Sequence, residues 1–154
     1  MSTNFTVVGG DLRIIKLAKM LAEDGNKVYT YGVEKAEELK ENENIIMCNK
    51  LQDAVKNSEI IIGPIPFSSN GKEINAPFGE NTISIRELMH VINAKILIAG
   101  SISPEVYNLA NDEYIEIIDI MKREELAVLN TISTAEGTIE IIIANTNKII
   151  HGSK

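Results

Sequence analysis

The residues best suited to chemistry follow the first apolar run of the chain. Residues 5–8 (FTVV) lead directly into Gly9, Gly10 and Asp11, and Arg13 stands two positions later. Two glycines permit a tight turn into a helix, and aspartate is a favoured N-cap. An arginine in the first helical turn opposes the helix dipole and so favours an anionic partner. The pattern therefore predicts anion recognition at this turn; a capped turn beside a solvated arginine is the plainer interpretation, and it stays open.

A second candidate region is the stretch 64–81, where no regular element can be placed. A loop of this length inside a compact domain usually has a function or is disordered. Residues 64–78 (PIPFSSNGKEINAPF) contain three prolines and two phenylalanines, which argue against disorder. We therefore predict a packed lid with a polar tip at 68–72. Lys72 either adds a second positive charge there or is an ordinary exposed lysine.

The third candidate lies near the C-terminus. Residues 133–136 (STAE) have the spacing of a capping box, which predicts that a helix begins here and runs to 144. Gly137 would fall in the first turn of that helix and weaken it by roughly 1 kcal/mol relative to alanine. A glycine retained at such a position permits close approach of a ligand or another backbone. We therefore expect this turn to face the same site.

Several classes of chemistry are disfavoured by what the sequence lacks. The ten glycines never fall as GxGxxG, and there is no GxxxxGK[ST], so a phosphate cradle for a dinucleotide is missing. His90 and His151 are isolated and Cys48 is the only cysteine, so we expect no metal site and no intrachain disulfide. No GxSxG motif marks a nucleophile.

Charge and hydropathy narrow the choice of partners. The formal net charge is −7, from 15 basic and 22 acidic residues, which disfavours nucleic acid as a partner. The longest apolar runs, such as 141–144 (IIIA), are too short to span a bilayer. The N-terminus has no charged n-region and no apolar h-region, so no signal peptide is expected.

The elements that must position these residues alternate along the chain. Short apolar runs predict strands, and helical periodicity with caps predicts helices between them. Because the central runs are apolar throughout, we expect an α/β fold: a single-domain, doubly wound parallel sheet, Rossmann-like or flavodoxin-like, with helices on both faces. Binding sites in such folds lie beyond the C-terminal ends of the strands. The expected strands are 5–8, 27–31, 45–47, 59–62, 95–99 and 114–118, and the expected helices are 12–24, 34–41, 51–55, 84–92, 103–111, 122–130 and 133–144.

Taken together, several of these segments resemble a known family. Residues 7–13 (VVGGDLR), 63–67 (GPIPF) with 70–71 (NG), and 129–139 (LNTISTAEGTI) are similar to the N-terminal domain of the A subunit of dipicolinate synthase, and 149–152 (IIHG) extend the similarity. The resemblance runs nearly end to end but covers only that domain. It implies that residues 1–150 form the substrate-side, catalytic-type domain. The family's second domain carries the dinucleotide glycines, and we expect it to be absent from this chain.

The resemblance also implies an activity. The family oxidises a cyclic hydroxy-tetrahydrodipicolinate to dipicolinate in the cytoplasm of the sporulating mother cell, with NADP and a flavoprotein-like B subunit. By itself this chain should bind a small cyclic dicarboxylate weakly, bind no cofactor and be inactive; self-association and the catalytic acid or base are left open. The rival interpretation is a non-catalytic, doubly wound binding or interaction module whose lid docks a partner protein. The residues carried over as substrate-binding are Gly10, Asp11, Arg13, Pro66, Ser68, Asn70, Thr134, Glu136 and Gly137.

Overall fold

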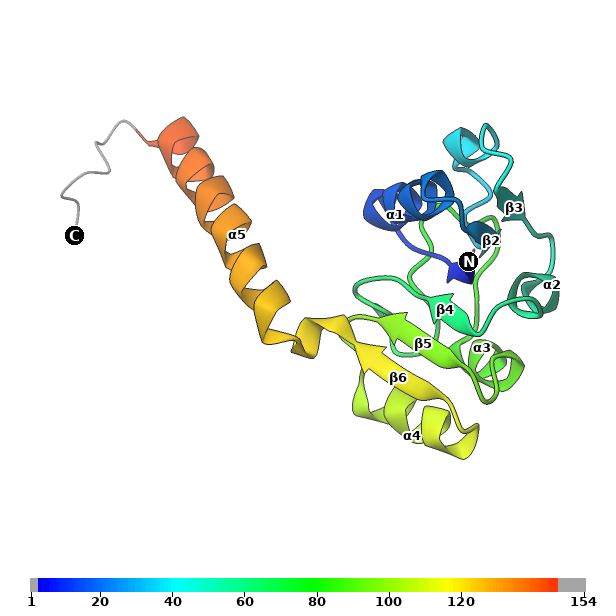
Figure 1. Cartoon of the computed structure of the whole chain (residues 1–154). Helices are drawn as coiled ribbons and strands as arrows, with labels where there is room; N and C mark the ends of the chain where they lie inside the picture. The colour runs from blue at the N-terminus through cyan, green and yellow to red at the C-terminus, as the bar shows by residue number, and fades with distance from the viewer. Residues whose placement is uncertain (1–2, 147–154) are drawn as a thin grey trace. The chain divides into compact units, whose positions relative to one another are not determined.

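The computed structural model of the chain describes residues 3–146, so that the 149–152 motif lies outside the described residues. The described chain divides after Ile120 into two compact units, which are treated separately below. The first unit contains a six-stranded, all-parallel sheet in the order β3-β2-β1-β4-β5-β6 (Figure 1). This is the Rossmann strand order, so the predicted fold class is confirmed, and the flavodoxin-like variant is not the one adopted.

The strands lie within two residues of the predicted positions. Their short length agrees with apolar runs of only three to five residues, bounded by glycine or polar residues. The strands are β1 Asn4–Val8, β2 Lys27–Tyr31, β3 Ile45–Met47, β4 Ile60–Ile62, β5 Ile96–Ala99 and β6 Glu116–Asp119. The last strand begins later than predicted because Tyr114 has a positive φ of 58° and forms a turn instead.

Helices fill the crossovers as expected, with one exception. The helix predicted over 34–41 is reduced to the short 3₁₀ turn η1, Glu37–Leu39, because a short, charged segment cannot offset the cost of helix nucleation. Ser84 and Ser103 occupy N-cap positions, as predicted, but their side chains make no capping hydrogen bond. The helices of the first unit are α1 Leu12–Glu23, α2 Leu51–Val55, α3 Ile85–Val91 and α4 Pro104–Asp112, and the 3₁₀ turn η2, Ile120–Lys122, follows β6.

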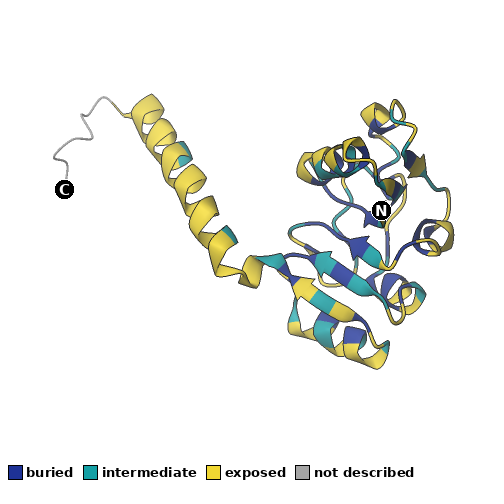
Figure 2. Ribbon diagram, viewed as in Figure 1, coloured by how far each residue is buried: buried dark blue, intermediate teal, exposed yellow. Residues whose placement is uncertain are grey.

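Alternate residues of the strands build two cores, one on each face of the sheet (Figure 2). On one face, Ile61 and Leu97 are fully buried under α2, α3 and α4. On the other face, Val7, Val28 and Ile62 pack against α1 and η1. Because α1 begins directly after β1, its N-terminus is held at the C-terminal edge of the sheet, where the predicted site lies.

The second unit is built on α5, Glu124–Asn145, a single helix of 22 residues. The prediction that the last segment is helical is confirmed, but the predicted start at 133 is wrong. The hydroxyl of Thr134 donates to the carbonyl of Asn130 at 2.8 Å, and the hydroxyl of Thr138 donates to that of Thr134 at 2.8 Å. These hydroxyls bond back to the preceding turn and leave no cap to break the helix.

The length and composition of α5 also meet the minimum for a membrane span, alone among the helices of the described residues. Glu136 and Glu140 lie within this helix. An acidic side chain at the centre of a bilayer costs roughly 2.5–3.5 kcal/mol. Each of these two glutamates would therefore add to the cost of placing the helix in a bilayer.

Candidate functional site

The strand order reverses between β1 and β4, and this switch point defines the candidate site. The loops leaving these two strands begin at Gly9 and Gly63, and they diverge at the C-terminal edge of the sheet. Ligands of doubly wound folds bind in the crevice between such loops. The anion-binding residues predicted from the sequence lie in this place.

The glycine turn after β1 is covered by another part of the chain. Gly9 and Gly10 have φ values of +66° and +106°. The N–H of Gly10 donates to the carbonyl of Asn75 at 2.9 Å, and a Cβ added at Gly9 would lie 3.1 Å from Cβ of Ala76. The backbone that would cradle a pyrophosphate in a dinucleotide-binding domain is therefore occupied by residues 74–76 of the long loop.

Asp11 and Arg13 form a pair at the start of α1. The Asp11 carboxylate caps the helix by accepting from the N–H of Arg13 at 3.0 Å. It also accepts from Arg13 Nε at 3.0 Å and from Nη2 at 2.8 Å. The hydrogen bond from Arg13 is the main reason that the pKa of Asp11 lies below its usual value. The anionic partner expected for Arg13 is thus supplied, at least in part, by its own chain.

Arg13 also links the two loops of the switch point. Its Nη2 donates to the carbonyl of Ile65, in the loop after β4, at 2.6 Å. The side chain is 66% exposed, and its Nη1 has no hydrogen-bond partner among the described residues. The guanidinium is therefore held in a defined position at the switch point, and part of its donor capacity faces solvent.

The long loop after β4 is irregular and packed, as predicted. Its one ladder contact is an isolated bridge between Glu73 and Ser84. Phe67 is 1% exposed, its carbonyl accepts from the N–H of Asn75 at 3.0 Å, and the preceding Ile65–Pro66 peptide is cis. The loop is thus anchored by a buried aromatic ring and returns over the glycine turn.

The polar groups at the tip of this loop form hydrogen bonds mainly with one another. Ser68 Oγ donates to the carbonyl of Glu73 at 2.6 Å and accepts from the N–H of Gly71 at 2.9 Å. Asn70 Oδ1 accepts from the N–H groups of Lys72 and Glu73, both at 2.9 Å. Ser68 and Asn70 therefore fix the shape of the loop. A hollow of about 270 Å³ lies beside them, lined by Ser69, Asn70, Glu73, Ile74, Asn75, Ala76 and Pro77.

Two carboxylates that the sequence analysis missed hold the loops at this edge of the sheet. Glu34, just after β2, accepts from the N–H of Gly32 at 2.7 Å and from that of Glu80 at 3.0 Å. In dinucleotide-binding domains an acidic residue near this position binds the ribose. Here Glu34 binds the N–H of Glu80 in the long loop instead. Asp119, at the end of β6, accepts from the N–H groups of Ser101 and Ile102, each at 3.2 Å. For Asp119 the available signal was a carboxylate directly after the apolar pair Ile117 and Ile118; Glu34 stands three residues beyond β2, and its signal was its place in the turn that follows a strand.

The predicted site residues therefore fall into two groups. Gly10, Asp11 and Arg13 line the switch point, with Pro66 to Asn70 in the adjoining loop. The predicted turn at Thr134, Glu136 and Gly137 does not exist, because all three residues lie in the interior of α5. Since positions two apart on a helix point to nearly opposite sides, Thr134 and Glu136 cannot both contact one small ligand.

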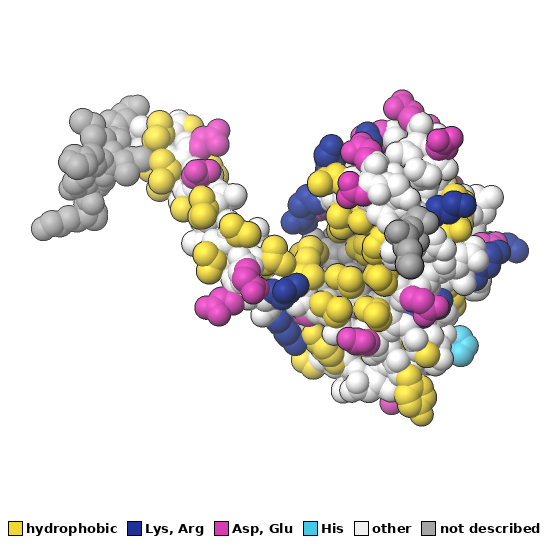
Figure 3. Space-filling model, viewed as in Figure 1, with side chains coloured by type: hydrophobic (Ala, Val, Ile, Leu, Met, Phe, Trp, Pro, Cys, Tyr) yellow, Lys and Arg dark blue, Asp and Glu magenta, His cyan; other side chains and the backbone are white. Residues whose placement is uncertain are grey.

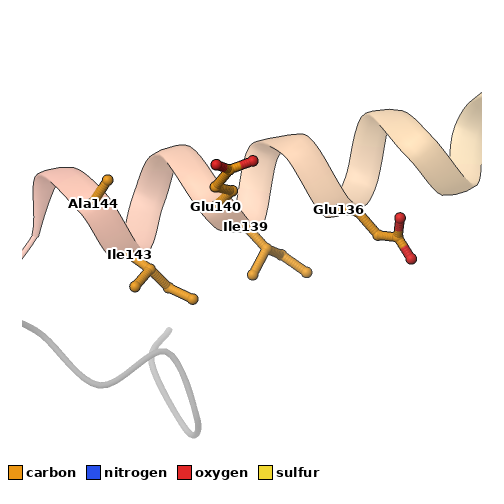
Figure 4. Close-up of a pocket in the computed structure, with 5 residues that line it drawn as sticks. All are labelled: Glu136, Ile139, Glu140, Ile143 and Ala144. Atoms are coloured by element: carbon orange, nitrogen blue, oxygen red, sulfur yellow. The ribbon is translucent and has the colours of Figure 1, made fainter.

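Glu136 instead borders an apolar strip of α5. Together with Ile139, Glu140, Ile143 and Ala144 it lines a shallow hollow of about 440 Å³ (Figure 4). All five residues come from one helix, and one helix cannot enclose a small molecule. The hollow marks an apolar surface of α5 that no other described residue of its unit covers.

Within residues 3–146, no group of three or more histidine, cysteine, aspartate or glutamate side chains is arranged to hold a metal ion. His90, one of the two histidines considered from the sequence, lies on the surface of α3 with its side chain 81% exposed and bonds to Glu113 at 3.1 Å.

Comparison with known proteins identifies the family to which the chain is similar. The sequence model that describes the N-terminal domain of the A subunit of dipicolinate synthase matches residues 4–121. The chain is 23% identical over 150 residues to the A subunit of dipicolinate synthase from Bacillus subtilis (strain 168), an alignment that covers 96% of this chain and 50% of that protein.

Solved structures show the same fold. The crystal structure of the A subunit of dipicolinate synthase from Bacillus subtilis has a TM-score of 0.84 at 22% identity and covers 99% of this chain and 51% of its own. The equivalent protein of Bacillus halodurans gives 0.83 at 20% identity, with coverages of 98% and 51%. An imine reductase variant from Myxococcus stipitatus, solved in complex with NAD+, gives 0.54 at 21% identity, with coverages of 77% and 40%. The chain thus spans about half the length of the dipicolinate synthase proteins that it matches.

Proposed function

The chain belongs to the family of N-terminal domains of the dipicolinate synthase A subunit, and from this premise we propose that it is the substrate-binding side of an NADP-dependent oxidoreductase. In this proposal the switch-point crevice binds a cyclic hydroxy-tetrahydrodipicolinate. A dinucleotide-binding half supplies NADP, and a B subunit completes the enzyme. Dipicolinate is the product, made in the cytoplasm of the sporulating mother cell.

The observation that carries the proposal is the position of Arg13. A dicarboxylate needs fixed cationic or N–H donors. Arg13 is held by Asp11 and by the carbonyl of Ile65, so its guanidinium loses little conformational entropy when an anion binds. The side chain is 66% exposed and lies at the switch point, the place where ligands of this fold bind.

The covered glycine turn supports the assignment of the substrate side. Gly10 and Glu34 occupy the positions that hold the pyrophosphate and the ribose in dinucleotide domains, yet both bond to the long loop. This unit is therefore poorly suited to hold a dinucleotide, and NADP is assigned to the half that the relatives carry in addition. The imine reductase of similar fold was solved in complex with NAD+, which supports a nicotinamide cofactor for the full-length relatives.

Of the residues predicted to bind substrate, the proposal retains the six on the first unit: Gly10, Asp11, Arg13, Pro66, Ser68 and Asn70. Thr134, Glu136 and Gly137 lie within α5 of the second unit, and their role in substrate binding stays a prediction from the sequence. The isolated chain is expected to bind substrate weakly and to be inactive.

Thermal unfolding with dipicolinate and other small dicarboxylates tests the proposal. A ligand at ten times its Kd stabilises the folded state by about 1.4 kcal/mol, which raises Tm by roughly 3–6 °C for a chain of this size. We expect this rise in the wild type and in Lys16→Ala, an exposed lysine of the same helix. We expect none in Arg13→Ala.

A wild-type protein that does not respond to any dicarboxylate would favour the alternative, a non-catalytic interaction module. A rise that persists in Arg13→Ala would mean that dicarboxylates bind elsewhere. Benzoate, with a single carboxylate, serves as the ligand control and should give a smaller shift.

A further inference from the structure

Asn75 joins the two loops of the switch point through its backbone. Its N–H donates to the carbonyl of Phe67, in the loop after β4, at 3.0 Å. Its carbonyl accepts from the N–H of Gly10, in the turn after β1, at 2.9 Å. Phe67 is only 1% exposed, so one of these two anchors belongs to the core. The backbone of Asn75 is therefore fixed at the place where ligands of this fold bind.

The fold does not account for the side chain of Asn75. Both backbone bonds can form with any residue except proline at this position. Asparagine is often found where φ is positive or where its side chain closes an Asx turn, but Asn75 does not have a positive φ. Within residues 3–146 its side-chain amide forms no hydrogen bond. Asn70 is the contrast, because its Oδ1 accepts two backbone N–H groups and so shapes the loop.

Asn75 is also part of a polar recess. It is half-buried, and it lines the hollow of about 270 Å³ at the tip of the long loop together with Ser69, Asn70 and Glu73. A hydrogen bond made in a partly enclosed place is stronger than one made in open water. The hydrophobic side chains that gather over β4, β5 and β6 (Figure 3) offer no such polar groups. The hollow is therefore suited to a polar part of a small ligand.

The chemistry of the hollow favours a hydroxyl group over a second carboxylate. The amide of Asn75 has a donor, Nδ2, and an acceptor, Oδ1, and a hydroxyl can use both because it donates and accepts. A carboxylate only accepts, so it would leave Oδ1 unused. The carboxylate of Glu73 lines the same hollow, and like charges brought together in a binding site repel each other.

Arg13 lies next to this hollow along the same loop. Its Nη2 donates to the carbonyl of Ile65 at 2.6 Å, and the N–H of Asn75 donates to the carbonyl of Phe67. Two residues of chain span at most about 7 Å, so Arg13 and Asn75 bond to the same short segment. A cation and a neutral amide thus stand beside each other at the switch point, as a ring that carries a carboxylate and a hydroxyl requires.

We propose that Asn75 is a substrate-binding residue that determines specificity: its amide hydrogen-bonds the ring hydroxyl of the cyclic hydroxy-dicarboxylate while Arg13 pairs with a carboxylate. The inference rests on the proposed function, which supplies the class of substrate. Asn75 then distinguishes the hydroxylated ring from dipicolinate, which has the two carboxylates and no hydroxyl. The product is therefore held less tightly than the substrate.

Two ligands that differ by one hydroxyl test this role: dipicolinate and 4-hydroxypyridine-2,6-dicarboxylate. Both are titrated into the ¹⁵N-labelled 154-residue chain and followed by NMR, which measures weak binding. A hydrogen bond between uncharged groups changes Kd by about fivefold, so the wild type should bind the hydroxylated ligand about fivefold more tightly. The side-chain NH₂ signal of Asn75 should shift more with the hydroxylated ligand than with dipicolinate.

Replacement of Asn75 should remove this difference. In Asn75→Ala both ligands should bind with the Kd that dipicolinate has in the wild type, and the ligand-free protein should keep its Tm because the amide makes no bond within the described chain. If Asn75→Ala lowers that Tm, Asn75→Leu replaces it, because leucine keeps the size of the side chain without its polar atoms. Asn81→Ala is the matched control: Asn81 is exposed and does not line the hollow, so this variant should discriminate like the wild type.

The outcomes separate this inference from the proposed function. A wild type that binds dipicolinate but gains nothing from the added hydroxyl would overturn the role of Asn75 alone. So would a preference for the hydroxylated ligand that persists in Asn75→Ala and Asn75→Leu. If neither ligand binds to the wild type, the proposed function fails and the inference fails with it. Arg13→Ala should weaken both ligands equally and leave their ratio unchanged, since Arg13 meets the carboxylate that they share.

Discussion

Replacement of Glu34 should release the long loop from the C-terminal edge of the sheet. The carboxylate accepts N–H groups from Gly32 at 2.7 Å and from Glu80 at 3.0 Å, and the second bond spans 46 residues of sequence. In Glu34→Ala both N–H groups lose this acceptor. Glu34→Gln keeps one oxygen and the length of the side chain, so it should retain about half of the stabilisation that these two hydrogen bonds provide.

The magnitude follows from the number and exposure of these bonds. A hydrogen bond to a charged group contributes about 1.5–3 kcal/mol when buried. Glu34 is only half-buried, so we take about 1 kcal/mol for each bond. Glu34→Ala should then lower the free energy of unfolding by about 2 kcal/mol and Tm by roughly 4–8 °C. Glu34→Gln should cost about half as much.

A second readout reports the charge itself. The pKa of Tyr31 is raised chiefly by burial, and then by the negative charges of Glu34 and Glu87. Glu34→Gln removes one of these charges, so the pKa of Tyr31 should fall part of the way toward its usual value. Absorbance titration of tyrosinate measures this change, as a shift in one of the four tyrosines.

Glu41→Gln and Glu41→Ala are the matched controls, because they remove the same charge at an exposed position of the same region. Hydrogen exchange at the amide of Glu80 should accelerate in Glu34→Ala and stay unchanged in the Glu41 variants. Equal Tm values for the Ala variants at positions 34 and 41, with no change in exchange at Glu80, would refute the anchoring role of Glu34.

Three further predictions concern the same edge of the sheet. Asp11→Ala should lower the free energy of unfolding by about 1 kcal/mol through loss of the N-cap, whereas Asp11→Asn should keep the cap. The pKa of Asp11 is lowered by its hydrogen bond from Arg13. The stabilisation from this pair is therefore present above the unfolded pKa of about 3.9 and is lost as pH falls through the lowered pKa. The free energy of unfolding, measured with urea at pH 7 and at pH 3, should differ less between the two pH values for Asp11→Asn than for the wild type. Asp119→Ala should cost about 2–3 kcal/mol, because the N–H groups of Ser101 and Ile102 lose their acceptor; a urea midpoint equal to that of the wild type would contradict this. Calorimetric titration of the chain with NADP should show no binding in the micromolar range, because the N–H that would hold the pyrophosphate is already bonded within the chain.

The fold could be predicted because its signals are local. Each strand is a short apolar run, such as 60–62, bounded by glycine or polar residues. Helix α1 is predicted by the cap at Asp11 and by the 3.6-residue period of its apolar residues. Strong local preferences and the handedness of βαβ crossovers leave few alternative topologies. The position of the site follows from the same information, because ligands of this fold bind at the strand ends.

The continuity of α5 could not be predicted because local signals conflict there. Residues 133–136 have the spacing of a capping box, and Gly137 is a weak helix former. In a helix of 22 residues, however, each added residue extends an existing helix, which is cheaper than starting a second nucleus. The threonine hydroxyls then donate hydrogen bonds to carbonyls of the preceding turn of the same helix.

By itself the sequence determined the parallel sheet, the capped turn after β1 and the presence of a cation beside it, because these features depend on neighbouring residues. Only the tertiary structure decided what that cation binds and what covers the glycines. Ile65 is 52 residues from Arg13, and Asn75 is 65 residues from Gly10, yet each pair is joined by a hydrogen bond. Contacts between residues so far apart are created by the chain's path through space, which no local pattern encodes.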